Sequence, residues 1–278
     1  MGPNILEKIF GTKKPIIGAL HFSPMIGYEG FTDEEEILKI ALADLRAFED
    51  GRVDGIIIEN NYDLPHKIKV GPETVALMTY LGKELKKATK LPVGVSVLWN
   101  DYRAALSIAK VIGAKFIRVP AFVDNICTSF GDIYGDAKDV IAYRKRINAE
   151  GIALFTDIQV KHSEMLDIKP ITESAKQAIG EGSDCLILTG RWTGDAPNLK
   201  RLTDVRSAVG NFPVILGSGA TNENVLDLFK YADGAIVSTA LKTGNAVAGE
   251  RNVKPHTERI SAQKVKEFMD AVNRTRNN

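Results

Sequence analysis

The chain has 278 residues, of which 44% are hydrophobic, enough for the core of one large α/β domain. Its 36 Lys and Arg side chains balance 35 Asp and Glu side chains, and no basic stripe carries interleaved aromatic residues, so no nucleic-acid partner is expected. Two cysteines, Cys127 and Cys185, are too few for a disulfide framework and favour the reducing cytoplasm. No leader-like segment is evident and no transmembrane run of roughly 18 apolar residues is found, which leaves peripheral membrane association open.

Short apolar runs alternate with longer amphipathic segments along the chain. The apolar runs are rich in Ile, Val and Leu, and the predicted strands cover residues 15–20, 54–58, 92–98, 115–119, 152–160, 185–188, 213–216 and 234–237. The segments between them have apolar residues at helical spacing, and the predicted helices cover residues 34–50, 72–90, 102–112, 137–149, 171–179, 199–209, 223–229 and 261–272. Residues 245–257 lack periodicity and are predicted to form a loop before the last helix.

Eight strand–helix units in unbroken succession predict a closed (β/α)₈ barrel, a TIM barrel, that spans residues 1–278 as a single domain. The near-continuous apolar strands fit this architecture, because parallel strands are covered on both faces. An open doubly wound sheet is the alternative. It is disfavoured because no G-x-G-x-x-G motif follows the first strand.

In such a barrel the residues that follow each strand line the mouth, where active sites lie. Here those positions are polar, whereas the opposite strand ends carry mainly Pro, Gly and apolar residues. Carboxylates, an amine and an imidazole can transfer protons or stabilise developing charge, and the predicted catalytic residues are Glu59, Asp157, Lys161 and His21. The predicted substrate-binding residues are Asn61, Asn100, Arg118, Thr189 and Gly190.

The seventh and eighth predicted strands end in small residues. Glycine lets a backbone approach an anion closely, and backbone N–H groups at such a turn can bind phosphate. The last two strands are also where TIM barrels often hold a phosphate. The predicted phosphate ligands are Gly217, Ser218, Gly219, Ser238 and Thr239. The alternative is that the glycines only permit a tight turn between strand and helix.

Alternation along the predicted fifth strand places Asp157, Gln159 and Lys161 on one face, and His162 on the other, toward the helices. Buried charges need partners, so the alternative to catalysis is an internal ion pair such as Lys161 with Glu59. A Schiff base on Lys161 is disfavoured, because the residue lies late in its strand. No cofactor is predicted, apart from an optional Mg²⁺ held by Glu59 or Asp157 together with a substrate phosphate.

Two loops that follow predicted strands contain glycines able to serve as hinges. Residues 122–136 follow the fourth strand, and residues 190–197 hold Trp192 between two glycines. Both loops are predicted to close over the mouth and exclude water. The alternative is an ordinary loop with Trp192 packed on the surface. His66 and His256 are interpreted as ordinary loop residues.

A set of short segments, taken together, resembles the BtpA family, which includes SgcQ-type proteins. The segments lie between residues 14 and 243 and read GALHFSP at 18–24, GIIIEN at 55–60, RV at 118–119, TDIQVKH at 156–162, TG at 189–190 and 193–194, and GSGAT at 217–221. The resemblance implies a barrel of the ribulose-phosphate-binding kind with a phosphorylated ligand, and it adds weight to Asp157, Lys161 and His162. The founding member is named for photosystem I biogenesis at thylakoid membranes, other members accompany sugar-uptake and sugar-utilisation genes, and the family name fixes no reaction.

Three functions fit these observations. The first is an isomerase, lyase or hydrolase acting on a phosphorylated sugar or a similar small phosphorylated metabolite. The second is a non-catalytic biogenesis or stability factor for a membrane complex of the photosystem I type. The third is nucleotide or nucleobase processing, with Trp99 or Trp192 stacked on a base. The polar mouth favours an enzyme, since a scaffold has no use for buried charges there, and the sequence is further expected to form a cytoplasmic homo-oligomer.

Overall fold

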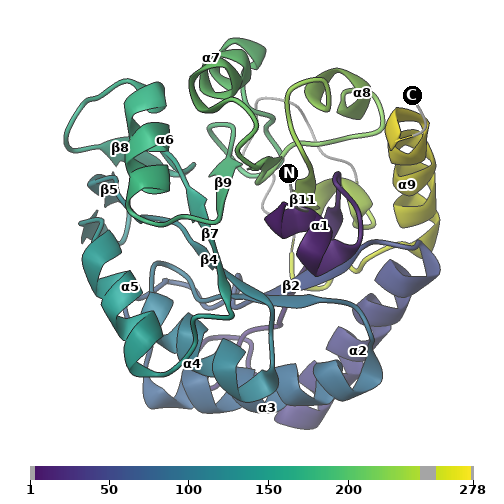
Figure 1. Cartoon of the computed structure of the whole chain (residues 1–278). Helices are drawn as coiled ribbons and strands as arrows, with labels where there is room; N and C mark the ends of the chain where they lie inside the picture. Colours follow the sequence, from purple (N-terminus) through teal and green to yellow (C-terminus); the bar gives the residue numbers. More distant parts are fainter. Residues whose placement is uncertain (1–3, 245–254, 277–278) are drawn as a thin grey trace.

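A computed structural model describes residues 4–244 and 255–276, and Figure 1 shows the path of the chain. The strands are β1 (Ile16–His21), β2 (Gly55–Glu59), β3 (Val93–Ser96), β4 (Phe116–Val119), β5 (Ile126–Thr128), β6 (Gly131–Ile133), β7 (Ala153–Asp157), β8 (Ser163–Met165), β9 (Cys185–Leu188), β10 (Val214–Leu216) and β11 (Ala235–Val237). The helices are α1 (Ile5–Phe10), α2 (Glu34–Asp50), α3 (Pro72–Ala88), α4 (Tyr102–Ile112), α5 (Ala137–Arg146), α6 (Ile171–Gly180), α7 (Leu199–Val209), α8 (Val225–Leu228), the short 3₁₀ helix η1 (Thr239–Leu241) and α9 (Ala262–Arg276).

The main sheet is a closed barrel of parallel strands in the order β1-β11-β10-β9-β7-β4-β3-β2. Each strand therefore pairs with its neighbours in chain order, and the helices surround the barrel in Figure 1. This arrangement confirms the predicted TIM barrel. The predicted strands and helices all occur, and most ends differ from the prediction by only a few residues.

Local sequence accounts for where the helices start. The Asp33 carboxylate accepts a hydrogen bond from the backbone N–H of Glu36 and caps α2. Pro72 occupies the first turn of α3, where its missing N–H costs nothing. The core-facing side of α2 contains Ile37, Ala41, Leu45 and Phe48.

Side chains along each barrel strand alternate between the barrel interior and the helix layer. The interior cluster includes Ile17, Ala19, Ile57, Phe116, Phe155, Ile187, Ile215 and Ile236. The residues between them, such as Ile16, Ile56 and Ile58, join the larger core under the helices. Because the alternation has a period of two, the next inward positions beyond this apolar layer lie at the carboxyl ends of the strands.

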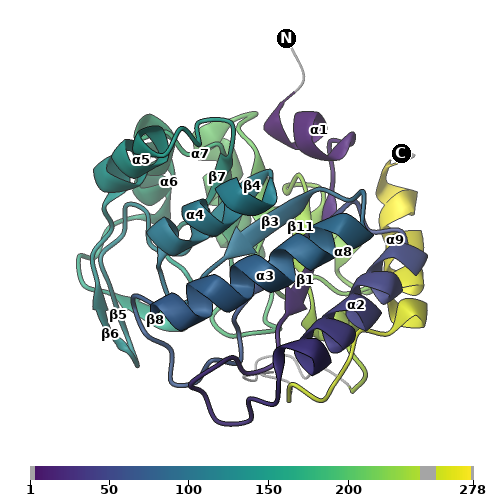
Figure 2. The same cartoon turned by 90° about the horizontal axis from the view of Figure 1, so that it is seen from below.

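The helix α1 covers the amino-terminal end of the barrel and was not expected from the sequence. Leu6 is fully buried in the interior cluster, and the ring of Phe10 meets Phe116 edge-on with 5.7 Å between ring centroids. Figure 2 shows α1 at one end of the barrel and the strands β5, β6 and β8 at the other. The mouth therefore lies at the end opposite α1.

A second sheet, with the strand order β6-β5-β8, stands beside the mouth. β5 pairs with β6 as a hairpin and with β8 in antiparallel register, Cys127 opposite Glu164 and Thr128 opposite Ser163. The loop after β4, predicted to be a closing loop, is thus a hairpin joined to the segment that follows β7. In the part of the chain that the structure describes, no helix has the length and apolar character to cross a bilayer. Most of the predicted loop at 245–257, namely residues 245–254, lies outside the described residues.

Candidate functional site

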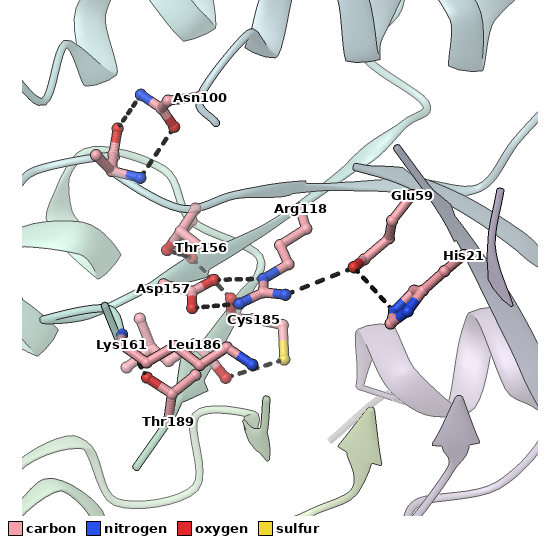
Figure 3. Close-up of polar contacts among 12 residues, drawn as sticks. His21, Glu59, Asn100, Arg118, Thr156, Asp157, Lys161, Cys185, Leu186 and Thr189 are labelled. Carbon is pink, nitrogen blue, oxygen red and sulfur yellow. Dashed lines mark hydrogen bonds and ion pairs between the residues drawn. The ribbon is translucent and has the colours of Figure 1, made fainter. Parts of the chain in front are cut away.

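Polar side chains from β1, β2, β4 and β7 form a connected chain across the mouth, shown in Figure 3. Arg118 donates to both carboxylate oxygens of Asp157, from Nε at 2.8 Å and from Nη2 at 2.9 Å. Its Nη1 lies 3.5 Å from Oε1 of Glu59, and Oε2 of Glu59 lies 3.5 Å from Nε2 of His21. We call His21, Glu59, Arg118 and Asp157 the mouth network. A two-point pairing of this kind fixes the guanidinium in place.

The mouth network is almost fully removed from solvent. Glu59 is 4% exposed, Arg118 is 6% exposed and Asp157 is fully buried. Burial raises the pKa of Glu59, an effect that the nearby cations oppose. Burial also lowers the pKa of His21 well below its ordinary value. His21 is therefore neutral at pH 7, and its contact with Glu59 is a polar contact rather than an ion pair.

Lys161 extends into the same mouth but does not join the network. Its backbone N–H donates to the hydroxyl of Thr189 at 2.9 Å, and its side chain lines the cavity. Among residues 4–244 and 255–276, no carboxylate oxygen lies within 4.0 Å of its ammonium nitrogen. The internal ion pair considered as the alternative to catalysis does exist, but its cation is Arg118 rather than Lys161.

The amine of Lys161 has an altered acidity. Burial, together with repulsion from Arg118, lowers the pKa of Lys161 to about 8, although Glu59 and Asp157 act in the opposite direction. With that pKa, about a tenth of the amine is neutral at pH 7. A lysine with the ordinary pKa of 10.5 would be almost entirely protonated.

The fifth barrel strand ends earlier than predicted, and this changes the position of its last residues. β7 stops at Asp157, and the backbone then turns, with φ of 47° at Gln159 and 61° at His162. The side chain of Gln159 donates to the loop before α6, so the predicted face shared with Asp157 is wrong for this residue. The outward position predicted for His162 is also wrong, because its ring lines the cavity and lies 2.8 Å from the hydroxyl of Thr193.

A cavity of about 490 Å³ opens at the mouth, and His21, Glu59, Arg118 and Lys161 line part of it. Residues 218–220 and 238–240, which follow β10 and β11, line it on the side of the barrel away from β4. We call them the β10–β11 wall. Their backbone N–H groups make no hydrogen bond within the described residues, and the hydroxyl of Ser238 is buried there without a partner. Large apolar side chains also line the cavity, among them Leu64, Leu98, Trp99, Phe130 and Trp192.

Close packing explains the two glycines after β10. A Cβ on Gly217 would lie 2.6 Å from the side chain of Ile187, and one on Gly219 would lie 2.1 Å from the backbone nitrogen of Ala196. The N–H of Gly217 already donates to Leu188 at 2.8 Å, so it is not available to an anion. The alternative given by the sequence, that these glycines serve a tight turn, therefore accounts for the missing side chains, while the neighbouring N–H groups remain unpaired.

Replacing Gly219 with Ala is expected to lower the free energy of unfolding by about 3 kcal/mol, because the new methyl group meets backbone in a left-handed conformation. Gly113 provides a matched control, since its φ of 76° is close to the 75° of Gly219 but nothing lies within 4 Å of its Cβ position. Gly113→Ala should cost only about 1 kcal/mol. Urea unfolding of both variants tests this, and equal losses would contradict the packing argument.

The predicted substrate-binding residues are divided between the cavity and its supports. Asn61 and Arg118 line the cavity, whereas Asn100, Thr189 and Gly190 do not. The amide of Asn100 both donates to and accepts from the backbone of Ala121 at 3.0 Å. The Thr189 hydroxyl accepts the backbone hydrogen bond described above, and a Cβ on Gly190 would meet the backbone of its own loop at 2.4 Å. These three residues hold the loops of the mouth.

The loop at residues 190–197 lies over the mouth. The N–H of His162 donates to its backbone at 3.2 Å, and the hydroxyl of Ser218 donates to the backbone oxygen of Asp195 at 2.9 Å. Trp192 lines the cavity, with its ring 5.4 Å from the ring of His162. The loop therefore bridges the segments that follow β7 and β10, and its opening and closing stay a prediction.

Several residues that line the cavity were not predicted from the sequence, among them Phe130 and His66. Phe130, in the turn between β5 and β6, and His66, in the loop after β2, line the cavity with ring centroids 5.2 Å apart. Burial lowers the pKa of His66 to about 4, so its ring is neutral. The pairing of β5 with β8 brings the hairpin to the mouth, and no local periodicity signals such a pairing.

The carboxylates of the mouth do not form a cation site. Both oxygens of Asp157 accept hydrogen bonds from Arg118, and Glu59 lies against the same guanidinium. Across residues 4–244 and 255–276, no group of three His, Cys, Asp or Glu side chains is placed to hold a metal ion. These donors do not fit the Mg²⁺ considered from the sequence.

Comparison with known proteins places the chain in a family. The family model described as "BtpA family" matches residues 12–274. The photosystem I biogenesis protein BtpA of Synechocystis is 36% identical over 240 residues, covering 85% of this chain and 83% of that protein. An uncharacterized protein of Archaeoglobus fulgidus is 35% identical over 240 residues, covering 86% and 96%. Among solved structures, N-(5′-phosphoribosyl)anthranilate isomerase from Pyrococcus furiosus has a TM-score of 0.55 at 15% identity over 94% of this chain and 99% of that one, which shows the shared barrel fold. With this family match, these relatives and this barrel, the chain belongs to the BtpA family.

Proposed function

We propose that this protein is an enzyme that acts on a small phosphorylated metabolite bound between the β10–β11 wall and the mouth network. The observation that carries the proposal is the cavity with two unlike sides. One side offers unpaired backbone N–H groups and the other offers buried titratable side chains. Buried charge is costly, and a protein that served only as a scaffold would gain nothing from burying Glu59, Arg118 and Asp157 beside a cavity.

The β10–β11 wall suits a phosphate group. The backbone N–H groups of residues 218–220 and 238–240 make no hydrogen bond within the described residues. A phosphate supplies acceptors for several donors at once. The buried hydroxyl of Ser238, which has no partner among the described residues, is a further donor. A phosphate held there would leave the rest of the molecule free to reach across the cavity toward Lys161 and Glu59.

The opposite side supplies groups that take and give protons. The raised pKa of Glu59 makes its carboxylate a stronger proton acceptor than an ordinary glutamate, and burial lowers the pKa of His21 so that its imidazole is neutral. Lys161 adds an amine that changes charge near neutral pH. Arg118, which Asp157 holds through two hydrogen bonds, lies against the carboxyl of Glu59. This set of groups supports isomerase, lyase or hydrolase chemistry.

The relatives add a second candidate. The Synechocystis relative, 36% identical, is named for photosystem I biogenesis, and the second candidate is therefore a biogenesis or stability factor for a membrane complex, without catalysis in the cavity. The two candidates make different demands on the cavity. An assembly factor keeps its function when Lys161 is replaced, whereas the proposed enzyme loses its activity.

Replacing Ser238 with Asp is expected to weaken the binding of phosphorylated ligands at least about tenfold, because the carboxylate would stand where the phosphate binds. Ser238→Ala removes one donor and adds no charge, so it should weaken binding less than about tenfold. Ligands come from a thermal-shift screen of phosphorylated sugars and nucleotides. A ligand at a hundred times its Kd stabilises the fold by about 2.7 kcal/mol. Equal affinity of the parent protein and Ser238→Asp, measured by calorimetry, would contradict a phosphate site at this wall.

A further inference from the structure

We propose that Lys161 is a nucleophile whose amine captures the carbonyl carbon of a phosphorylated ketone or aldehyde as an imine. The proposal rests on the proposed function and narrows its substrate to a carbonyl compound. The sequence disfavours this role because Lys161 comes late in its predicted strand. In the structure the strand is shorter and Lys161 lies beyond it. β7 ends at Asp157, and the turn that follows returns Lys161 to the cavity.

The backbone around Lys161 is held from several sides. Ile158 donates its N–H to Ile187 at 3.1 Å, Lys161 donates to the hydroxyl of Thr189 at 2.9 Å, and His162 donates to Arg191 at 3.2 Å. All three acceptors belong to β9 or the loop after it. The Cα of Lys161 is therefore fixed against β9. A fixed stem limits the directions in which the amine can approach a bound substrate.

The mouth network explains why the amine is not held as a counter-ion. Asp157 and Glu59 are the anions nearest to the position that Lys161 takes, and Arg118 pairs with both. In Figure 3 the Lys161 side chain runs beside the Arg118–Asp157 pair without a contact to it. The amine is thus left in the cavity with no carboxylate partner among the described residues, which is the state an attacking amine requires.

Lys242 shows what a buried lysine with a structural role looks like in this protein. It is 4% exposed, and burial lowers its pKa to about 8, as for Lys161. Its ammonium, however, donates to the hydroxyl of Tyr62 at 2.6 Å, and it does not line the cavity. The two lysines thus have a similar acidity and differ in access to a ligand.

Formation of the imine requires the Lys161 amine, the carbonyl group of the substrate and proton transfer by Glu59. The lone pair of the Lys161 amine forms a bond to the carbonyl carbon, and the π electrons of the C=O bond move to oxygen. The Glu59 carboxylate takes a proton from the nitrogen and passes it to that oxygen. A second proton, taken from water through Glu59, lets the hydroxyl leave as water, and the nitrogen lone pair closes a protonated C=N bond. Oε1 of Glu59 and Nδ1 of His21 are buried without a hydrogen-bond partner among the described residues, so both can serve a bound substrate.

The test is reductive trapping on the full chain. The protein is incubated with dihydroxyacetone phosphate or ribulose 5-phosphate, and in parallel with dihydroxyacetone or ribulose. Sodium borohydride then delivers hydride to any imine and makes a stable secondary amine, which peptide mass mapping locates. The phosphorylated probes are expected to label Lys161 at least about tenfold more than Lys242 or any exposed lysine, because among the described lysines Lys161 alone combines a neutral fraction with access to the cavity. The Lys161→Met variant should lack this label.

The outcomes separate the imine from the phosphate site. Labelling that spreads over exposed lysines, or no label on Lys161 with any probe, overturns the imine. The Ser238 variants and the ligand screen then still test the proposed function on their own. If Lys161 is labelled equally with and without a phosphate on the probe, and inorganic phosphate does not compete, the result supports the imine and contradicts the phosphate site. Strong labelling only by the phosphorylated probes, suppressed by inorganic phosphate, supports both.

Discussion

Replacing Arg118 with Met is expected to lower the free energy of unfolding by about 3–5 kcal/mol. The guanidinium is the partner of two buried carboxylates, and its loss leaves Asp157 and Glu59 without a cation in contact. Those carboxylates must then take up protons or stay charged at a cost. The variant should accordingly lose more stability at pH 8 than at pH 5, because protonation relieves the unpaired charge at the lower pH. Urea unfolding at the two pH values measures this.

The Arg103–Asp139 pair provides a control with the same bonding but a different environment. Arg103 donates to Asp139 from Nε at 3.0 Å and from Nη2 at 2.7 Å, as Arg118 does to Asp157. The side chains of this control pair are 45% and 28% exposed, against 6% and 0% for the buried pair. Arg103→Met should therefore cost far less stability than Arg118→Met. Similar losses for the two variants would show that burial does not govern the energetics of the mouth network.

Replacing Lys161 with Met is expected to reduce turnover by about 10³-fold or more once a substrate is in hand, because the reacting amine is gone. The apparent melting temperature should stay level or rise, since no ion pair is lost and a buried amine is replaced by an apolar side chain of similar length. Steady-state kinetics and calorimetry on the same preparation measure the turnover and the melting temperature. A fall in stability with normal turnover per folded molecule would make Lys161 a structural residue.

The acidity of Lys161 also sets a pH dependence. Its pKa is lowered from 10.5 to about 8, so between these values the unfolded chain binds a proton that the folded chain does not. The free energy of unfolding of the parent protein therefore gains from this residue as the pH rises from 8 toward 10.5, and lacks that gain below 8. We expect Lys161→Met to remove this contribution, so that the stability advantage of the variant is largest below pH 8. Turnover by the parent should rise as the pH approaches 8 from below, as the neutral amine accumulates.

The barrel could be predicted from the sequence because each strand–helix unit carries its own signal. Helix α2 begins and ends at the predicted residues, since Asp33 caps it and its apolar residues repeat at helical spacing. The positions of Glu59, Asp157 and Lys161 at the mouth follow from the rule that strand ends of a parallel barrel meet on one side. Their inclusion in the predicted site required only the order of the strands.

The features that could not be predicted from the sequence depend mainly on contacts between segments far apart in the chain. The alternative to catalysis named Lys161 as an example of a partner for Glu59, but Arg118 occupies that position, and no pattern in either strand distinguishes the two cations. The early end of β7, which displaces Gln159 and turns His162 inward, comes from tertiary hydrogen bonds to β9 and its loop. The helix α1 was missed because a six-residue segment carries too little periodicity to detect.

The antiparallel pairing of β5 with β8 has a consequence for engineering the mouth. In most barrels the loops that follow the strands can be varied one at a time, which lets a single scaffold acquire new specificities. Here the loop after β4 and the segment after β7 share a hydrogen-bonded ladder, and β8 begins at Ser163, two residues beyond Lys161. A deletion of one residue in the hairpin would shift the register of that ladder and move the lysine with it. Grafting experiments on this scaffold therefore have to transfer residues 120–136 and 158–170 as one cassette.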